Sequence, residues 1–303
     1  MPLAPRSERS PVYGVDFSAA AADAGTKTWV ARGTAADAGG LTIDAVDPLV
    51  EFLDLDAADR ETALPALAAW VRGLGGDAVV GLDFPFGLPA FIIAAADHDS
   101  WRSFITEFPE GFVDGDIGAA DDPVRAFAER CVELTEMHGE GTYDRRETDA
   151  AVGARSPYGF IADTIAFYGM RDVLALVADA ARVMPMDAGR DPVPDGPTVV
   201  ETYPAAVFDR LGLCRTKYKG GSEAERTRRR RNATGLTAGS VAPAGGTVTY
   251  RSTAETVETL VGDASGDALD AVAACVGAYG ALTAGFETDA DPEAVTREGY
   301  IYA

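Results

Sequence analysis

Cysteine and histidine are scarce in this chain of 303 residues, and their scarcity excludes several kinds of site. The three cysteines, Cys131, Cys214 and Cys275, contain no CxxC pair, which argues against structural zinc and is typical of a protein kept reduced. The two histidines, His98 and His138, have no partner at the spacing of a metal ligand. No Ser-His-Asp arrangement, nucleophile elbow or P-loop is visible either. Any chemistry must therefore come from other residue types.

Long apolar runs are also missing from the sequence. No uninterrupted stretch is long enough to span a bilayer, and no basic-then-apolar leader opens the chain. We therefore expect a cytoplasmic protein without membrane contact. We expect residues 1–10 to form a short disordered tail. We expect residues 11–303 to form a single domain, because a chain of 303 residues is long enough for one large core.

Positive charge is scarce relative to negative charge. Acidic residues outnumber basic residues 48 to 26, giving a formal net charge of −22, and only three of the basic residues are lysines. This composition is typical of an extreme halophile. Because the screening length at about 1 M salt is only about 3 Å, such a surface does not exclude a nucleic-acid partner.

The order of apolar segments predicts an α/β fold. Three short strands in succession, expected to form an antiparallel meander, are PVYGVDFSAA (11–20), TKTWVARGTA (26–35) and GLTIDAVDPL (40–49). An amphipathic helix over 61–74 then leads to a fourth strand, DAVVGLDFP, which can pair in parallel beside the first. We expect residues 90–187 to form an inserted helical cap. After it, the segment GPTVVETYPAAVFDRLGL (196–213) is expected to form a further strand followed by a helix.

Two of the apolar strands end on an acid, Asp16 in VYGVDFSAA and Asp83 in VVGLDFPFGLP. An unpaired charge at the end of a buried strand is costly, so something must compensate it. If the two strands are parallel neighbours, both carboxylates lie at the carboxyl ends of the strands, where open α/β sheets hold their ligands. Oxygen ligands of this kind suit Mg²⁺ or Mn²⁺. Alternatively, each acid ends its strand through a side-chain turn to its own backbone.

Two further acids stand at distinctive places. Glu201 lies in the fifth strand, where it is either a metal ligand or general base, or an exposed residue of an edge strand. Asp267 and Asp270 share one face in the first turn of an Ala-rich helix. Helix N-termini favour acids through capping and the dipole, so we assign Asp267 a structural role and Asp270 the role of a ligand.

The stretch CRTKYKGGSEAERTRRRR concentrates positive charge in a chain that otherwise avoids it. Lys217, Lys219, Arg228 and Arg229 are therefore candidate contacts to a substrate phosphate. The alternative is a solvated helix whose glutamates offset its arginines. In the cap, YDRRETD offers Arg146 as a further substrate contact, although such a run also fits a surface salt-bridge cluster.

Taken together and in this order, the segments GVDFS, GLDFPFGLP, VETYP, YKGG, RTRRRR, DALDAVAA and EGYIYA resemble the domain-of-unknown-function 429 family, usually described as predicted nucleases of the RNase H-like fold. The resemblance implies a five-stranded mixed sheet of order 3-2-1-4-5 with helices on both faces. It also implies that Asp16, Asp83 and Asp270 bind the metals, with Glu201 as a fourth acid. The DALDA helix is similar to the acidic last helix of Holliday-junction resolvases.

The sequence thus predicts a nuclease or phosphodiesterase that hydrolyses nucleic acid with two Mg²⁺ or Mn²⁺ ions. In such two-metal sites the ions lie about 3.5–4 Å apart. One alternative is a non-catalytic binding module of the same fold, whose carboxylates would lie too far apart to share a metal. Another is an ATP-handling protein of the actin and sugar-kinase type, which would need a second core within residues 90–187.

Overall fold

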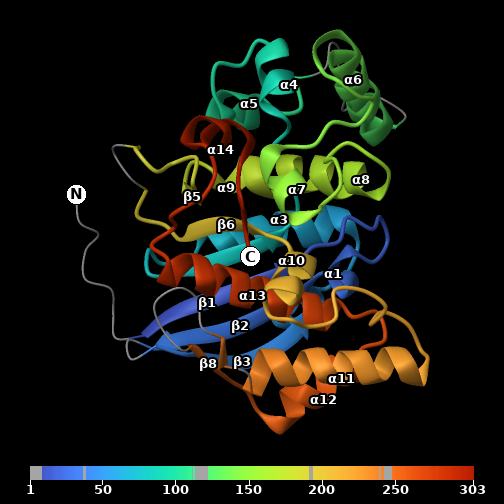
Figure 1. The fold of residues 1–303 in the computed structure, drawn as a ribbon, viewed down its shortest axis with the longest axis vertical. Coiled ribbons are helices and arrows are strands. Elements are labelled where there is room, and N and C mark those ends of the chain that lie inside the picture. Colours follow the sequence, from blue (N-terminus) through green and yellow to red (C-terminus); the bar gives the residue numbers. More distant parts are fainter. Residues whose placement is uncertain are drawn as a thin grey trace.

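A mixed sheet lies at the centre of the molecule, with helices on both of its faces (Figure 1). The computed structural model describes residues 9–36, 39–110, 112, 122–190, 194–238, 240–241 and 248–303. Most of the tail expected at residues 1–10 lies outside the described residues, and Arg9 and Ser10 already belong to the first strand.

The core of the sheet has the predicted order. Strand β1 (Arg9–Asp16) pairs in antiparallel fashion with β2 (Trp29–Ala36), which pairs in the same way with β3 (Leu41–Pro48). On its other side β1 pairs in parallel with β4 (Val79–Asp83), and β4 pairs in parallel with β6 (Thr198–Thr202). With β6 as the expected fifth strand, the order 3-2-1-4-5 is confirmed.

Short strands extend the sheet beyond the five that the sequence predicts. Strand β5 (Arg182–Met184) and strand β9 (Ile301–Tyr302) pair with successive parts of β6, and both are parallel to it. At the opposite edge, β8 (Val248–Arg251) pairs with β3 and then with β7 (Ser240–Val241). Strands of two to four residues are too short to show a period-2 pattern, which is why sequence patterning misses them.

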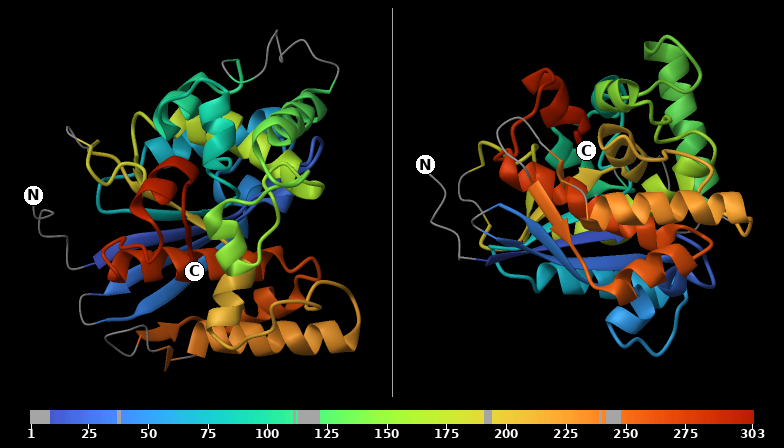
Figure 2. Two further views of the ribbon diagram at one scale, coloured as in Figure 1. Left: turned by 45° about the horizontal axis from the view of Figure 1, so that its top comes forward. Right: turned by 60° about the horizontal axis from the view of Figure 1, so that its bottom comes forward.

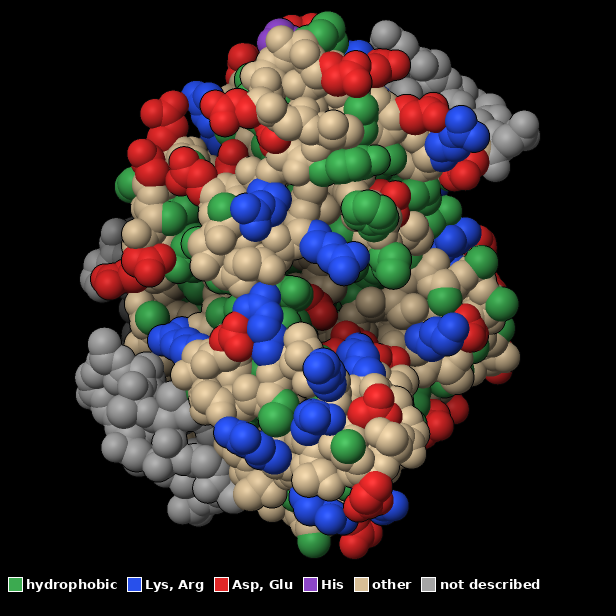
Figure 3. Space-filling model, turned by 45° about the vertical axis from the view of Figure 1, so that its right-hand side comes forward, with side chains coloured by type: hydrophobic (Ala, Val, Ile, Leu, Met, Phe, Trp, Pro, Cys, Tyr) green, Lys and Arg blue, Asp and Glu red, His purple; other side chains and the backbone are tan. Residues whose placement is uncertain are grey.

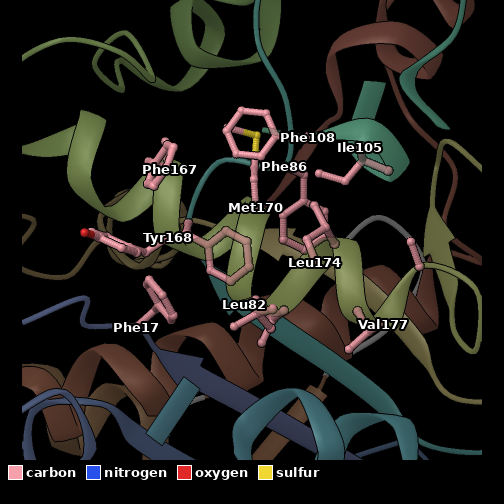
Figure 4. Packing of buried hydrophobic residues seen from close by; sticks show 14 of the residues in the cluster. Phe17, Leu82, Phe86, Ile105, Phe108, Phe167, Tyr168, Met170, Leu174 and Val177 are labelled. Carbon is pink, nitrogen blue, oxygen red and sulfur yellow. The ribbon is translucent and has the colours of Figure 1, made fainter. Parts of the chain in front are cut away.

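One face of the sheet is covered by α3 (Arg60–Arg72) together with the helices of residues 90–177. These helices are α4 (Ala90–Ala95), α5 (Trp101–Glu107), α6 (Pro123–His138), α7 (Glu147–Val152), α8 (Ile161–Tyr168), the π-helix Gly169–Leu174 and α9 (Ala175–Val177). Their apolar side chains share one core with the sheet, and this core includes Phe17 and Leu82 as well as Phe167 and Met170 (Figure 4). The inserted helices are therefore packed onto the sheet and have no separate sheet of their own among the described residues.

The other face is covered by α13 (Asp267–Thr283), which crosses β1, β2 and β4, and by α10 (Pro204–Arg210) beside it. The pair α11 (Glu223–Ala238) and α12 (Ala254–Gly262) packs at the end of the molecule opposite α4, α5 and α6 (Figure 2). Three small elements complete the chain: α1 (Ala24–Lys27), α2 (Leu49–Phe52) and α14 (Pro292–Glu298). None of the helices in the described part of the chain combines the length and apolarity needed to cross a membrane.

Candidate functional site

Asp16 and Asp83 are register partners at the carboxyl ends of β1 and β4. Side chains alternate along a strand, so both acids point to the same face as the glycines two residues before them, Gly14 and Gly81. Those glycines lie against α13. The sequence predicts that the two strand-end carboxylates come together. The pairing of β1 with β4 places Asp16 directly beside Asp83, as that prediction requires.

Helix α13 lies directly on the sheet because those two strand positions are glycine. A Cβ atom at Gly14 would lie 2.2 Å from the Ala271 carbonyl oxygen, and one at Gly81 would lie 2.7 Å from the Ala274 carbonyl oxygen. Any larger residue would push the helix away. The close contact brings the first turn of α13, which carries Asp270, over the ends of β1 and β4.

Asp16 and Asp270 are buried, Asp83 is half-buried, and the three carboxyl groups act on one another electrostatically. Burial, the Asp270 carboxylate and then the Asp83 carboxylate raise the pKa of Asp16 well above its usual range. Burial and the Asp270 carboxylate do the same for the pKa of Asp83. The pKa of Asp270 is raised to about 6, because burial outweighs the opposing effect of Lys219. Burial and mutual repulsion therefore favour the protonated forms of these acids unless a cation compensates their charge.

Lys219 supplies the nearest positive charge. Its Nζ lies 2.7 Å from Asp270 Oδ2 and 3.0 Å from Asp267 Oδ1. The Tyr218 hydroxyl donates to the other oxygen of Asp270 at 2.8 Å. Burial lowers the pKa of Lys219, but Asp270 and Asp16 outweigh it and raise that pKa, so the side chain stays an ammonium ion. The cation is half-exposed and sits at the mouth of the carboxylate cluster.

Arg229 holds the loop that presents Lys219. Its side chain is buried and donates to the carbonyl oxygens of Tyr218 at 2.7 Å, Gly220 at 2.6 Å and Val261 at 3.0 Å. Arg228 lies one position earlier on α11 and donates to the carbonyl oxygen of Lys217 at 3.3 Å. Of the four basic residues that the sequence singles out here, Lys217 and Lys219 are exposed, Arg228 is half-buried and Arg229 faces the interior.

Glu201 lies on the opposite face of the sheet from the three aspartates, although its charge still contributes to the raised pKa of Asp83. It is the register partner of Leu82, which faces the core beneath the inserted helices. Both of its carboxylate oxygens accept from Arg146, at 2.7 Å and 2.5 Å, and one also accepts from the Phe86 amide at 3.0 Å. The pKa of Glu201 is still raised, because burial outweighs the guanidinium. The structure thus does not place Glu201 with the aspartates on the α13 face.

Arg146 is fully buried and joins three parts of the chain. Besides Glu201 of β6, it bonds both oxygens of Asp149 in α7 and the carbonyl oxygen of Glu298 at 3.1 Å. The Glu298 carboxylate in turn accepts from the amides of Ala90 and Glu147. The predicted substrate contact Arg146 is therefore enclosed in an ion-pair network that fastens the inserted helices to the sheet.

Residues beyond the predicted set also border the carboxylates. Tyr203 follows β6 and is half-buried. The pKa of Tyr203 is raised, because burial and the Asp83 carboxylate outweigh the opposite effect of Arg215 and Arg155. The side of the molecule that carries α10 and α11 is hollowed near its middle, with acidic side chains at the floor of the hollow and Lys and Arg side chains around it (Figure 3). The sequence signals for these tyrosines are weak: Tyr203 directly follows the last residue of β6, two positions after Glu201, and Tyr218 lies between Lys217 and Lys219.

The donor set can be tested against a divalent metal. Carboxylate oxygens are the ligands that Mg²⁺ and Mn²⁺ prefer, and among the described residues the groups that act on the three aspartates include no cysteine and no histidine. In the described residues, however, no group of three or more His, Cys, Asp or Glu side chains already stands close enough to hold a metal. The chemistry of Asp16, Asp83 and Asp270 therefore fits a hard cation, but their side chains would have to move closer together, and Asp270 would have to exchange its Lys219 partner for the metal.

Comparison with known proteins gives one match. A family model described as "Protein of unknown function (DUF429)" matches residues 14–288, which include all three aspartates and the Lys219 loop. No curated protein and no solved structure matches the chain.

Proposed function

Because the chain belongs to the DUF429 family, we propose a function from its own site: a divalent-metal-dependent phosphodiesterase that acts on nucleic acid. The observation that supports this proposal is the cluster of Asp16, Asp83 and Asp270 at the carboxyl edge of the sheet, with Lys219 at its mouth. Acids whose pKa values are raised by burial and by one another lose their protons most readily when a cation compensates their charge. The RNase H-like fold is part of the same proposal. It is supported by the strand order in the core of this sheet, which is the order expected for that fold.

The three aspartates would hold Mg²⁺ or Mn²⁺, which supplies Lewis-acid activation of the phosphodiester and of an attacking water. Release of Lys219 from Asp270 leaves its ammonium free to hold a substrate phosphate at the mouth of the cluster. Tyr218 keeps Asp270 oriented through its hydroxyl bond. Arg229 keeps Lys219 in place through the backbone of the loop.

The basic residues around the Lys219 loop supply binding rather than chemistry in this proposal. Lys217 and Arg228 flank the loop that carries Lys219, and their charges contribute to attraction of a phosphate backbone. Glu201 and Arg146 act through the fold, because each satisfies the other away from the aspartates. We therefore assign them no contact with substrate.

A non-catalytic binding module is the second candidate, and one observation favours it. Lys219 already neutralises part of the cluster, and the three aspartates as they stand in the described structure do not form a ready metal site. A protein of this kind would bind its partner without needing a metal. Nothing in the described part of residues 90–187 favours the ATP-handling alternative, since its one strand, β5, belongs to the main sheet.

Hydrolysis of labelled nucleic acid separates the two candidates. Single-stranded, duplex and junction substrates of DNA and RNA are incubated with Mg²⁺ or Mn²⁺ and with the wild-type chain or Asp83→Asn. The phosphodiesterase requires cleavage that depends on metal and disappears in Asp83→Asn, with circular dichroism unchanged. Binding without cleavage in both chains would instead identify the binding module.

The composition guides the assay conditions. We propose a halophilic protein, because the charge of −22 repels itself at low salt, so the assays are run at high KCl. The three cysteines are all free thiols, which supports our placement of the protein in a reducing cytoplasm. The assay buffer therefore contains a reductant.

A further inference from the structure

A second candidate site lies between α7 and α8, in the segment that the carboxylate cluster does not use. A pocket of about 520 Å³ opens there, with Tyr143, Arg145, Arg155, Ser156 and Phe160 among its lining residues. Its volume is in the range of small-ligand sites. The proposed phosphodiesterase chemistry assigns it no role.

Two aromatic rings of this pocket are open to solvent. Phe160 is 75% exposed and Tyr143 is 48% exposed, whereas most large apolar side chains of the described residues are buried. Their ring centroids are 5.9 Å apart and their planes are inclined by 36°, so the two rings form a shallow platform. Phe160 also has a φ of 52°, an uncommon conformation for a residue other than glycine.

The polar groups of the pocket lack partners. The Ser156 side chain is 5% exposed, and its Oγ has no hydrogen-bond partner among the described residues. Buried hydroxyl groups are normally satisfied, so this oxygen points to a missing ligand or water. Arg145 and Arg155 are exposed, and neither forms an ion pair within the described part of the chain. Both guanidinium groups are therefore available to an anion.

The charge of the pocket is opposite to that of the chain. Two arginines and no acid line it, although acids outnumber bases 48 to 26 overall. A larger pocket of about 740 Å³ beside α6 has the reverse character, with Asp122, Glu129, Glu133 and Asp163 in its lining. Only the smaller of the two combines aromatic faces with unpaired positive charge, the combination that binds unpaired nucleotides.

The pocket is linked to the carboxylate cluster through Tyr203. Arg215 donates to the carbonyl oxygens of Val152 and Gly153, which precede the pocket residues, and its guanidinium lies 5.6 Å from the centre of the Tyr203 ring. Tyr203 directly follows β6, whose parallel neighbour β4 ends on Asp83. The pocket therefore lies on the same side of the molecule as the carboxyl edge of the sheet.

We propose that this pocket binds one unpaired nucleotide of the substrate strand. The base stacks on Phe160 and Tyr143, Ser156 hydrogen-bonds its edge, and Arg145 and Arg155 hold the adjoining phosphate. The inference rests on the proposed nucleic-acid substrate, and it specifies that the substrate is single-stranded or locally unpaired.

Fluorescence anisotropy tests this inference without any turnover. Fluorescein-labelled single-stranded DNA and RNA oligonucleotides, and the fully paired duplexes of the same sequences, are titrated in EDTA with the wild type, Phe160→Ala and Ile161→Ala. Ile161 is the matched control, because it is the next residue, is 76% exposed and does not line the pocket. Phe160→Ala should weaken single-strand binding by about 5- to 140-fold, the effect of losing one stacked base. Ile161→Ala should leave binding unchanged.

Several results would overturn the inference. They are absence of oligonucleotide binding by the wild type, equal binding of single strand and duplex, and equal affinities of the two variants. A change of sedimentation in Phe160→Ala with unaltered oligonucleotide binding would identify the platform as a contact between copies of the chain, and would overturn it as well.

The two proposals fail in distinguishable ways. If no variant or wild-type chain cleaves nucleic acid, but Phe160→Ala still weakens binding in EDTA, the phosphodiesterase fails and the nucleotide pocket stands. If cleavage depends on Asp83 while Phe160→Ala binds and cleaves as the wild type does, the pocket fails and the phosphodiesterase stands.

Discussion

Gly14 of β1 lies against the backbone of Cys275 in α13, so closely that a Cβ atom at Gly14 would be 2.0 Å from the Cys275 amide nitrogen. This contact seats α13 on the sheet and sets the height of its first turn above the strand ends. The distance between Asp270 and the pair Asp16 and Asp83 therefore depends on a residue that has no functional group.

Gly14→Ala should separate α13 from the sheet. Overpacking of this kind lowers the free energy of unfolding by about 1–3 kcal/mol, and the displaced helix should also weaken any metal binding by the aspartates. The control is Gly280→Ala on the same helix, where an added Cβ meets nothing within 4 Å. Because alanine is the better helix former, this control should be neutral or more stable by up to about 1 kcal/mol. Urea unfolding at constant KCl measures both variants, and equal stabilities would refute the close-contact explanation.

Arg146→Met should destabilise the fold without touching the aspartates. It leaves the Glu201 and Asp149 carboxylates buried without their partner, which typically costs about 3–5 kcal/mol. Arg145→Met is the matched control, since the preceding arginine is exposed and should change the stability by no more than about 0.5 kcal/mol. The same urea unfolding experiment distinguishes them. An Arg146→Met variant as stable as its control would show that the network contributes nothing.

Lys219→Met should tighten Mn²⁺ binding. The ammonium that bonds Asp270 and Asp267 competes with a metal for the same oxygens, and each 1.4 kcal/mol of competition removed is about a factor of ten in affinity. We expect a gain on the order of tenfold. Lys217→Met is the control, because this nearby lysine forms no ion pair within the described residues. Calorimetric titration measures the change, and weaker binding in Lys219→Met would mean that the ammonium supports the metal instead of competing with it.

Sequence patterning predicts the centre of this fold well. The sequence shows two strands that each end on an acid, with a helix between them. This pattern is sufficient to place Asp16 beside Asp83, because neighbouring parallel strands end at the same edge of the sheet. Asp270 is singled out by its position in the first turn of an Ala-rich helix, whereas its grouping with Asp16 and Asp83 is implied only by the family resemblance. These features are local in the chain, or follow from the pairing of two strands.

Features that depend on distant partners are not predictable in this way. All five residues of β6 are buried, so the alternation that would reveal the face of Glu201 is absent, and its partner Arg146 comes from the inserted helices. The arginine run of α11 looks uniform in sequence, yet only Arg229 turns inward to the Tyr218 and Gly220 carbonyls. Tertiary contacts decide both outcomes.

The central claim is that Asp16, Asp83 and Asp270 together bind a divalent metal, and calorimetric titration of Mn²⁺ at high KCl tests it most directly. The chains compared are wild type, Asp16→Asn and the control Asp99→Asn, which removes one negative charge at an exposed position. We predict saturable binding in the wild type and in Asp99→Asn, and its loss in Asp16→Asn. Absence of binding in the wild type, or binding that is unchanged in Asp16→Asn, would contradict the claim.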